Sequence, residues 1–172
     1  IVYGISDFGL ARGTGVTREE AKAYIERYLD SYPGVRRYMQ EVVAMGREKG
    51  YVSTVLGRRR YLPDLLSSNR TVRSMAERMA LNAPIQGTSA DIIKLAMLSV
   101  YRELKRRNLR SRMLLQVHDD LVFEVPLEEL EEVALLVRDC MENAFELKVP
   151  LEVEVKVGVN WYDMKRWEIS NA

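Results

Sequence analysis

Residues 112–125 read RMLLQVHDDLVFEV, two short apolar runs with only His118, Asp119 and Asp120 between them. Apolar runs of this length that meet at a polar turn are typical of a β-hairpin whose strands pack against a core. Neighbouring residues within a strand point to opposite faces, whereas both carboxylates of a turn can reach one site at its rim. The pattern therefore predicts a tight hairpin that carries two carboxylates at its tip.

Helices and a second hairpin are expected along the rest of the chain. Thr17 and Glu20 form a capping box, which predicts the start of a helix. Pro33 suits the first turn of the next helix, and Gly50 suits its end. The expected elements are a helix over 17–31, a helix over 33–49, a hairpin over 51–62, a long helix from about residue 71, an acidic amphipathic helix over 127–147 and a one-sided strand over 151–159. Mixed helices and antiparallel hairpins predict an α+β fold.

The long helix contains a potential break. Apolar residues follow helical spacing from Val72 to Ala80 and again from Ile92 to Leu104. Pro84 lies between these two stretches, and proline lacks the backbone N–H that an α-helix requires. We therefore expect the helix to be bent or interrupted over 82–84.

Composition excludes several classes of protein. The chain has 172 residues, of which 47% are hydrophobic and 30% charged, so it can bury a core and does not resemble a disordered chain. Cys140 is the only cysteine, which excludes an internal disulfide and fits a reducing cytosol. No apolar run approaches the roughly 20 residues of a membrane span, and no signal peptide opens the chain. We expect a cytoplasmic, nucleoid-associated protein without a membrane partner. The absence of an initiator Met indicates a fragment of a longer chain.

The net charge of +1 conceals a strong asymmetry. Residues 1–112 hold 21 Lys and Arg against 11 Asp and Glu, whereas residues 113–172 hold 5 against 14. A basic segment followed by an acidic one suggests a polyanion partner for the first and cations or solvent for the second. Solvated helix faces explain the same charges equally well.

Asp119 and Asp120 are the candidate metal ligands. Adjacent carboxylates repel each other, so a half-buried pair needs a cation or a proton. Mg²⁺ takes oxygen ligands, typically one or two carboxylates completed by water and substrate phosphate. The alternative is simpler, because Asp is also a favoured turn residue with no further role. His118, the only histidine, is by itself more typical of a turn or a surface than of a metal site.

Five segments resemble the family A DNA polymerases, the bacterial DNA polymerase I type. VHDDLVFEV, over 117–125, resembles the family's motif C, and the other four resemble further segments of the family in the same order. These are IVYGISDFGLA over 1–11, LGRRRYLPDL over 56–65, NAPIQGTSADIIKLAM over 82–97 and LEVEVKVGVNW over 151–161. The resemblance implies an antiparallel palm sheet with long helices, with 1–50 as the C-terminal part of the fingers and 51–172 as that of the palm.

The same resemblance implies a reaction. A family A polymerase adds deoxynucleotides to a primer 3′ end by phosphoryl transfer that uses two Mg²⁺ ions. Asp119 resembles the family's second catalytic aspartate, a metal ligand. Asp120 stands where the family usually has Glu, and its side chain is one methylene shorter, which leaves a direct metal contact open. The implied partners are template-primer DNA, deoxynucleoside triphosphates and the rest of the polymerase chain, in replication-linked repair.

A row of polar residues is expected to contact DNA. Arg78, Asn82 and Gln86 are spaced at i, i+4 and i+8, which places them on one stripe of a helix. Their donors suit the minor-groove acceptors that every base pair presents, so they can test pair geometry without reading sequence. A polar solvent face is the alternative. The resemblance favours DNA contact for this row and for His118, which matches a residue that touches the primer terminus, and we also assign Gln116 to DNA contact.

Two further groups complete the predicted site. Arg58, Arg59 and Arg60 are plausible phosphate contacts, as are Arg70 and Arg73 beyond them, whereas the basic residues of 105–112 equally suit a solvated helix end. Tyr3 resembles the tyrosine at the end of the fingers helix, which occupies the template-base position until the fingers close, and Gly4 beside it supplies backbone freedom. A helix-end core aromatic is the alternative for Tyr3.

Parts of a complete polymerase are missing from the sequence. The family's other catalytic aspartate and the Arg and Lys that hold the triphosphate have no match, so we expect the isolated chain to be inactive. A non-catalytic nucleic-acid-binding remnant, a single-subunit RNA polymerase and a purely structural α+β domain are the competing interpretations. The polymerase interpretation requires the carboxylates of 119–120 to face the groove that the row at 78, 82 and 86 lines.

Overall fold

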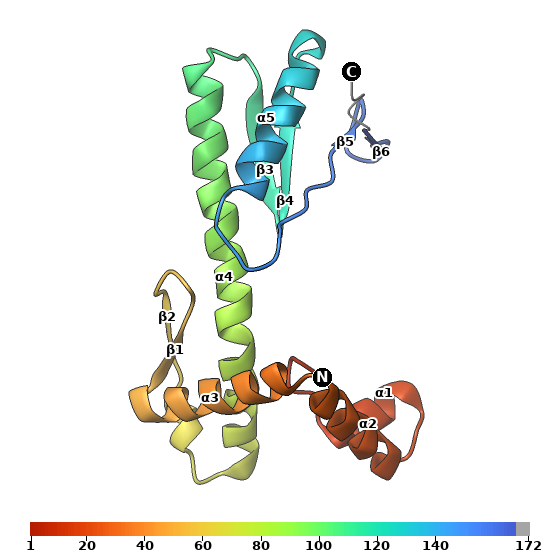
Figure 1. Cartoon of the computed structure of the whole chain (residues 1–172), viewed down its shortest axis with the longest axis vertical. Coiled ribbons are helices and arrows are strands. Elements are labelled where there is room, and N and C mark those ends of the chain that lie inside the picture. Colours follow the sequence, from red (N-terminus) through yellow and green to blue (C-terminus); the bar gives the residue numbers. More distant parts are fainter. Residues whose placement is uncertain (168–172) are drawn as a thin grey trace. The chain divides into compact units, whose positions relative to one another are not determined.

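The computed structural model describes residues 1–167, which form helices and small antiparallel sheets, so the predicted α+β class is confirmed. The chain divides into two compact units, the first from Ile1 to Thr88 and the second beginning at Ser89 (Figure 1). The boundary lies inside one helix. The expected division into fingers at 1–50 and palm at 51–172 follows family likeness and remains a prediction. Among the described residues, no helix has both the length and the apolar character needed to cross a membrane.

The first unit opens with three helices, α1 (Asp7–Thr14), α2 (Arg18–Ser31) and α3 (Pro33–Lys49). The capping box at Thr17 and Glu20 is present, and Gly50 ends α3 with a φ of 75°. The helices over 17–31 and 33–49 are therefore confirmed. Helix α1 is a separate element that the resemblance of 1–11 to a helix end did not predict. Ser6 caps it by accepting a hydrogen bond from the backbone N–H of Gly9.

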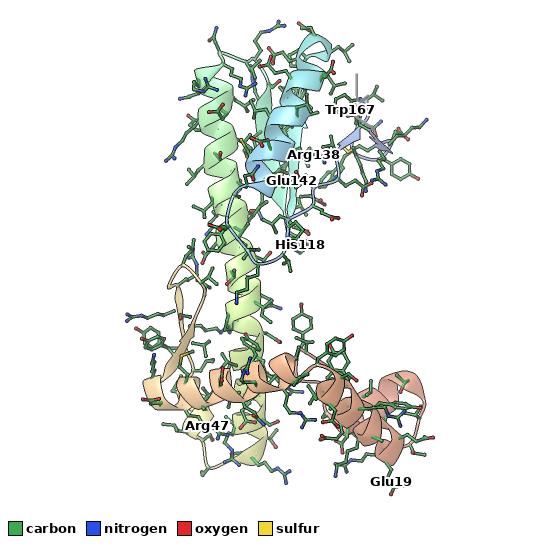
Figure 2. All side chains as sticks on the ribbon, viewed as in Figure 1. Glu19, Arg47, His118, Arg138, Glu142 and Trp167 are labelled. Carbon is green, nitrogen blue, oxygen red and sulfur yellow. The ribbon has the colours of Figure 1, made fainter. Side chains whose placement is uncertain are left out.

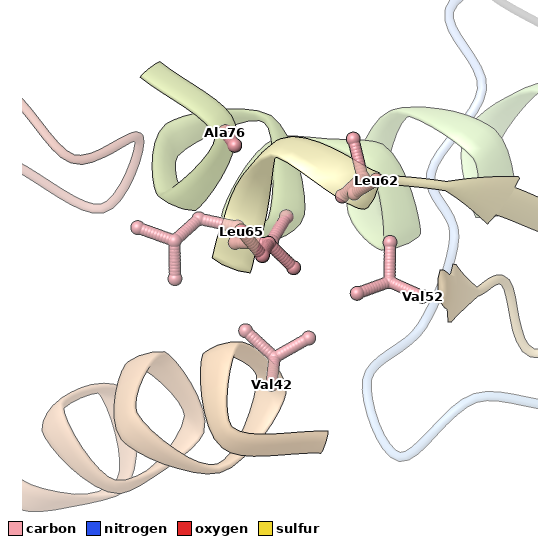
Figure 3. Close-up of a cluster of buried hydrophobic side chains, with 7 residues drawn as sticks. Val42, Val52, Leu62, Leu65 and Ala76 are labelled. Atoms are coloured by element: carbon pink, nitrogen blue, oxygen red, sulfur yellow. The ribbon is translucent and has the colours of Figure 1, made fainter. Parts of the chain in front are cut away.

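A small hairpin and a short 3-10 helix follow. Strands β1 (Tyr51–Ser53) and β2 (Arg59–Tyr61) pair antiparallel, as the residues of 51–62 predicted, and η1 (Pro63–Leu66) leads on from β2. The core of this unit lies between α3, the hairpin, η1 and the start of α4 (Figure 3). Its buried members are Val42, Val52, Leu62, Leu65, Ala76, Ala80 and Leu81. Apolar burial of this kind contributes roughly 25 cal/mol per Å² and fixes the hairpin on the helices.

Helix α4 (Arg70–Arg106) has 37 residues and runs through Pro84. Of the bend or interruption expected over 82–84, the interruption is wrong, because one helix continues on both sides of the proline, and the bend remains a prediction. The missing N–H removes a single helical hydrogen bond, whereas buried Ala80 and Leu81 before it and buried Ile93 and Ala96 after it hold the helix by packing.

The second unit packs a hairpin and a helix against the C-terminal part of α4. Strands β3 (Arg112–Val117) and β4 (Asp120–Glu124) form the predicted hairpin, and α5 (Leu130–Glu142) follows the short 3-10 helix η2 (Leu127–Glu129). The buried cluster of this unit takes Val100 and Leu104 from α4 and its other members from α5, namely Val133, Leu136, Val137 and Cys140. Met113, Phe123 and Val125 pack on it from the hairpin region.

Two expectations for the second unit need correction. The acidic helix over 127–147 is shorter, because α5 ends at Glu142 and Asn143 closes it with a hydrogen bond to the Asp139 carbonyl. The strand over 151–159 is reduced to β5 (Lys156–Val157), which pairs with β6 (Lys165–Arg166). A strand needs a neighbour for its backbone groups, and within the described chain β6 offers only two residues.

Candidate functional site

The predicted carboxylates lie at the tip of the β3–β4 hairpin. Val117 pairs with Asp120, so the loop consists of His118 and Asp119 alone and Asp120 is the first residue of β4. His118 has a φ of 55°, a left-handed conformation that a two-residue loop imposes and that His tolerates better than most residues. Its carbonyl accepts a hydrogen bond of 2.6 Å from Nε2 of Gln116 (Figure 2 labels His118). Gln116 therefore supports the turn from within the hairpin.

A β-bulge in β3 shifts its pairing with β4, the strand that begins at Asp120. The register shifts between Met113 and Leu115, so Leu114 has no partner across the hairpin. Met113 and Phe123 face the buried cluster, whereas Asp120 lies on the opposite face of β4 together with Val122. The carboxylate of Asp120 consequently points away from the core of its own unit. No pattern in the sequence indicates this bulge.

Both carboxylates are accessible to a cation. Asp119 and Asp120 are exposed, and neither forms an ion pair with another described residue. The described residues contain no group of three or more His, Cys, Asp or Glu that could hold a metal ion by themselves. The donor set fits Mg²⁺ only as a partial site, because Mg²⁺ accepts one or two carboxylates and completes its shell with water and phosphate oxygens.

The row Arg78, Asn82 and Gln86 lies on one continuous helix, α4, in the first unit. Arg78 and Gln86 are exposed, and Asn82 is half-buried. The Oδ1 atom of Asn82 is buried without a hydrogen-bond partner among the described residues. Burying an unsatisfied amide oxygen costs about 1–3 kcal/mol, so packing alone does not account for Asn at this position. Because the carboxylates of 119–120 belong to the second unit, the shared groove remains a prediction.

The predicted template gate, Tyr3 and Gly4, lies against Arg78, the first residue of the row on α4. The backbone turns at Gly4, with a φ of +77°, and the Gly4 N–H donates to the Ile1 carbonyl over 2.7 Å. A Cβ at Gly4 would lie 3.0 Å from Cγ of Arg78 and 3.0 Å from Cδ1 of Leu81. Tyr3 is 57% exposed, so it is not a core aromatic here. The structure thus brings together Gly4 and Arg78, which the sequence assigned to separate parts of the site.

Of the three arginines at 58–60, the two that lie in β2 point to opposite faces of the hairpin. Arg60 pairs with Val52, and Arg59 pairs with Ser53 on the opposite side of the hairpin. Between the hairpin and α4 lies a hollow of about 360 Å³. Its lining consists of Val52, Ser53, Thr54, Arg58, Arg59, Arg60, Ala83, Gln86 and Gly87. Positive charge from the hairpin and the amide of Gln86 therefore meet at one concave surface within the first unit.

The more C-terminal basic residues are engaged with acids of their own unit. Arg106 and Arg107 form ion pairs with Glu103, and Arg107 also pairs with Glu132 over 3.0 Å. Arg110 pairs with Glu128 and Glu129. These contacts favour a structural role over phosphate binding for this group, whereas the sequence suggested either phosphate contact or a solvated helix end.

Glu129 supports the start of the β3 strand and was not singled out from the sequence. Its carboxylate accepts hydrogen bonds from Oγ and N of Ser111, at 2.7 and 2.9 Å, and from the backbone N–H of Arg110. The hydroxyl of Ser111 and the backbone of Arg110 lower the pKa of Glu129 below its ordinary value, because each of these bonds favours the charged form.

Comparison with known proteins assigns the family. Residues 1–163 match the sequence profile described as DNA polymerase family A, a range that contains every residue predicted for the site. The chain belongs to DNA polymerase family A. DNA polymerase I of Bacillus caldotenax is 55% identical over 165 residues, which are 96% of this chain and 19% of that protein. DNA polymerase I of Bacillus subtilis is 53% identical over the same shares.

A solved polymerase structure has the same fold. The POL domain of Pol1 from M. smegmatis, in complex with DNA primer-template and dNTP, matches with a TM-score of 0.85 and 58% identity. The match covers 88% of this chain and 27% of that one. This chain therefore spans about a fifth of the curated family A relatives and about a quarter of the solved domain.

Proposed function

We propose that the polymerase to which this chain belongs is a DNA-directed DNA polymerase that extends a primer 3′ end with deoxynucleotides. The family match over residues 1–163 carries this proposal. The Pol1 structure that resembles this chain holds a DNA primer-template and a dNTP, and we extend both partners to the present protein. We further propose that this nucleotidyl transfer serves replication-linked DNA repair, in the cytoplasm beside the nucleoid.

Asp119 is proposed as the catalytic carboxylate of this chain, with Asp120 as a second candidate. The two-residue loop and the hydrogen bond from Gln116 fix the backbone from which Asp119 projects. Asp120 lies on the hairpin face that is turned away from the core, where its carboxylate remains open to a ligand. Two Mg²⁺ ions would supply activation of the primer hydroxyl and stabilisation of the charge on the leaving pyrophosphate. Asp119 would hold one of them with substrate phosphate and with carboxylates from outside this chain.

The first unit is proposed to hold the template-primer duplex. Arg78, Asn82 and Gln86 would donate to minor-groove acceptors, which are present in every base pair. The arginines at 58 and 60 would bind phosphates at the hollow that Gln86 also lines. His118 would contact the primer end. Such contacts are independent of sequence, as the function requires.

Tyr3 and Gly4 are proposed as the template gate. The exposed ring of Tyr3 is free to stack on a base, and the left-handed Gly4 provides a hinge beside it. Because the Gly4 backbone packs against Arg78 and Leu81, movement of the gate would be transmitted to Arg78, the first residue of the minor-groove row.

The rest of the polymerase is proposed to cover exposed apolar surface of the second unit. Leu114 and Leu115, at and after the bulge of β3, are 54% and 49% exposed. Monomeric proteins rarely leave a sheet face of this kind uncovered. We assign the cover to polymerase segments beyond this chain, which would also supply the second catalytic aspartate and the triphosphate clamp.

The function is tested with the full-length polymerase that contains this chain. We expect template-directed extension of a DNA primer with Mg²⁺ and deoxynucleotides, and little extension when ribonucleotides replace them. Extension with ribonucleotides alone would favour a single-subunit RNA polymerase. DNA binding without any extension would favour a non-catalytic remnant, and the absence of both would leave only a structural domain.

A further inference from the structure

The outward face of the β1–β2 hairpin carries two aromatic rings and an arginine. Tyr51 pairs with Tyr61 across the hairpin and Ser53 pairs with Arg59, so these four side chains share one face. The opposite face carries Val52, which is buried in the core of the first unit. The hairpin is therefore two-sided, with Val52 packed in the core on one side and a polar-aromatic surface on the other.

The rings and the guanidinium lie in contact with each other. The ring centroids of Tyr51 and Tyr61 are 5.6 Å apart with a tilt of 59°. The Arg59 guanidinium lies 4.8 Å from the centroid of the Tyr51 ring, a cation–π distance. Tyr61 is 67% exposed, although a tyrosine ring gains considerably from burial. Its ring is thus held by its neighbours while much of its surface is open to solvent.

Charge selects the partner for this face. Residues 51–62 contain three arginines and no acidic residue, so the surface around the rings is positive. A positive surface with exposed aromatic rings is the combination by which proteins hold single-stranded nucleic acid, with bases stacked on rings and phosphates near arginines. Bases within a duplex already stack on each other, so only an unpaired base presents a free face to Tyr61.

We propose that this Tyr51–Arg59–Tyr61 face binds the unpaired part of the template strand, with a base stacked on the Tyr61 ring and Arg59 beside its phosphate. The inference rests on the proposed polymerase function and adds to it a separate site for the strand that awaits copying. Arg60, on the other face of the hairpin, lines the hollow beside Gln86, and Arg59 contributes to the lining of that hollow as well.

The experiment compares two DNA substrates bound to the full-length polymerase. One is a blunt duplex, and the other is the same duplex with a single-stranded 5′ template extension that contains 2-aminopurine, whose fluorescence reports stacking. The unpaired extension is expected to increase affinity. The Tyr61→Thr variant keeps strand propensity but lacks the ring. Its affinity for the substrate with the unpaired extension is expected to fall about tenfold, while its affinity for the blunt duplex stays unchanged.

Two variants serve as controls. Tyr61→Phe keeps the ring and is expected to retain the increase. Tyr24→Ala removes another exposed tyrosine of the first unit that has an arginine near its ring, Arg27 at 6.0 Å, but that lies on α2 beside Glu19, Glu20, Glu26 and Asp30. It is expected to have no effect on either substrate.

The outcomes separate this inference from the function on which it rests. Equal affinity of the wild type for both substrates, or an unchanged increase in Tyr61→Thr, would overturn the template-strand site. An equal loss on both substrates in Tyr61→Thr would also overturn it, since that result indicates a purely structural ring pair. A wild-type protein that binds neither DNA would instead refute the proposed polymerase function.

Discussion

The side chain of Thr54 occupies the space in which an alanine at position 87 would place its Cβ, because Cγ2 of Thr54 lies 2.5 Å from that point. The residues that follow each of these two also meet, because the backbone N–H of Val55 donates a hydrogen bond to Oγ1 of Thr88 over 3.2 Å. The Arg-rich hairpin is thus fastened to α4 beside Gln86. Glycine at 87 is required here by close approach rather than by backbone conformation.

We predict that Gly87→Ala destabilises the polymerase by about 1–3 kcal/mol, the usual range for overpacking. Glycine to alanine in a helix is otherwise favourable by roughly 1 kcal/mol, so the sign of the effect is diagnostic. Thr54→Ser removes the obstructing methyl group and keeps the hydroxyl that accepts from the Arg58 N–H. Differential scanning calorimetry should therefore show recovery in the double variant Gly87→Ala/Thr54→Ser.

Gly34→Ala is the matched control for this pair. Gly34 also lies in a helix, α3, and a Cβ added there would meet nothing within 4 Å. We expect this variant to be neutral or slightly stabilised. A destabilised Gly34→Ala, or a double variant that is no better than Gly87→Ala, would contradict the interlock between hairpin and helix.

Glu129→Gln should reduce stability in a manner that depends on pH. The hydroxyl of Ser111 and the backbone of Arg110 lower the pKa of Glu129 below its ordinary value. A carboxyl whose folded-state pKa is lowered contributes stability above its unfolded pKa and loses it as the pH falls through the folded pKa. The difference in denaturation midpoint between wild type and Glu129→Gln should therefore be largest at neutral pH and shrink in the acid range.

Glu131→Gln provides the comparison, since Glu131 is exposed in the first turn of α5. We expect a small difference from wild type that changes little with pH. A pH-independent difference for Glu129→Gln would show that the hydrogen bonds to Arg110 and Ser111 do not depend on its charge.

Gln86→Ala and Arg60→Gln should weaken DNA binding in different ways. Gln86 is uncharged, and we expect its loss to lower affinity about fivefold without a change in salt dependence. Loss of an arginine that contacts a phosphate should instead reduce the slope of log affinity against log salt by about one. Fluorescence anisotropy over a salt series distinguishes the two. Unchanged affinity in both variants would show that the hollow beside α4 is not part of the DNA interface.

Local signals were sufficient for most of the fold. The capping box at Thr17, the terminating Gly50 and the acidic turn at His118 and Asp119 act within a few residues, and the structure has each of them. The position of Arg78, Asn82 and Gln86 on one helix was predicted, because helical spacing depends only on sequence distance.

Other features depend on partners distant in sequence and were missed. The bulge at Leu114, the fit of Thr54 against Gly87 and the support of Ser111 by Glu129 have no local pattern. The break at Pro84 was predicted from a local rule that packing on both sides of the proline overrides. The strand over 151–159 was overpredicted because alternation indicates a strand but does not supply its neighbour.

The 172-residue chain, prepared by itself, should show no measurable primer extension. One pair of adjacent carboxylates does not complete a two-metal site, and the chain has no match for the family's triphosphate clamp. A gel-based extension assay with Mg²⁺ and deoxynucleotides checks this, with the full-length polymerase as the positive control. Extension by the pure isolated chain would show that the catalytic set is complete within it.

The single-turnover rate of nucleotide addition by the full-length Asp119→Asn variant tests the proposed catalytic role most directly. The change keeps the shape of the side chain and removes the charge that a Mg²⁺ ligand needs. We predict a fall of roughly a hundredfold or more, with DNA affinity unchanged or increased because a negative charge near the phosphates is lost. Glu124→Gln, at the end of β4 that is distant from the turn, should leave the rate unchanged. A normal rate in Asp119→Asn would contradict the assignment of this hairpin to catalysis.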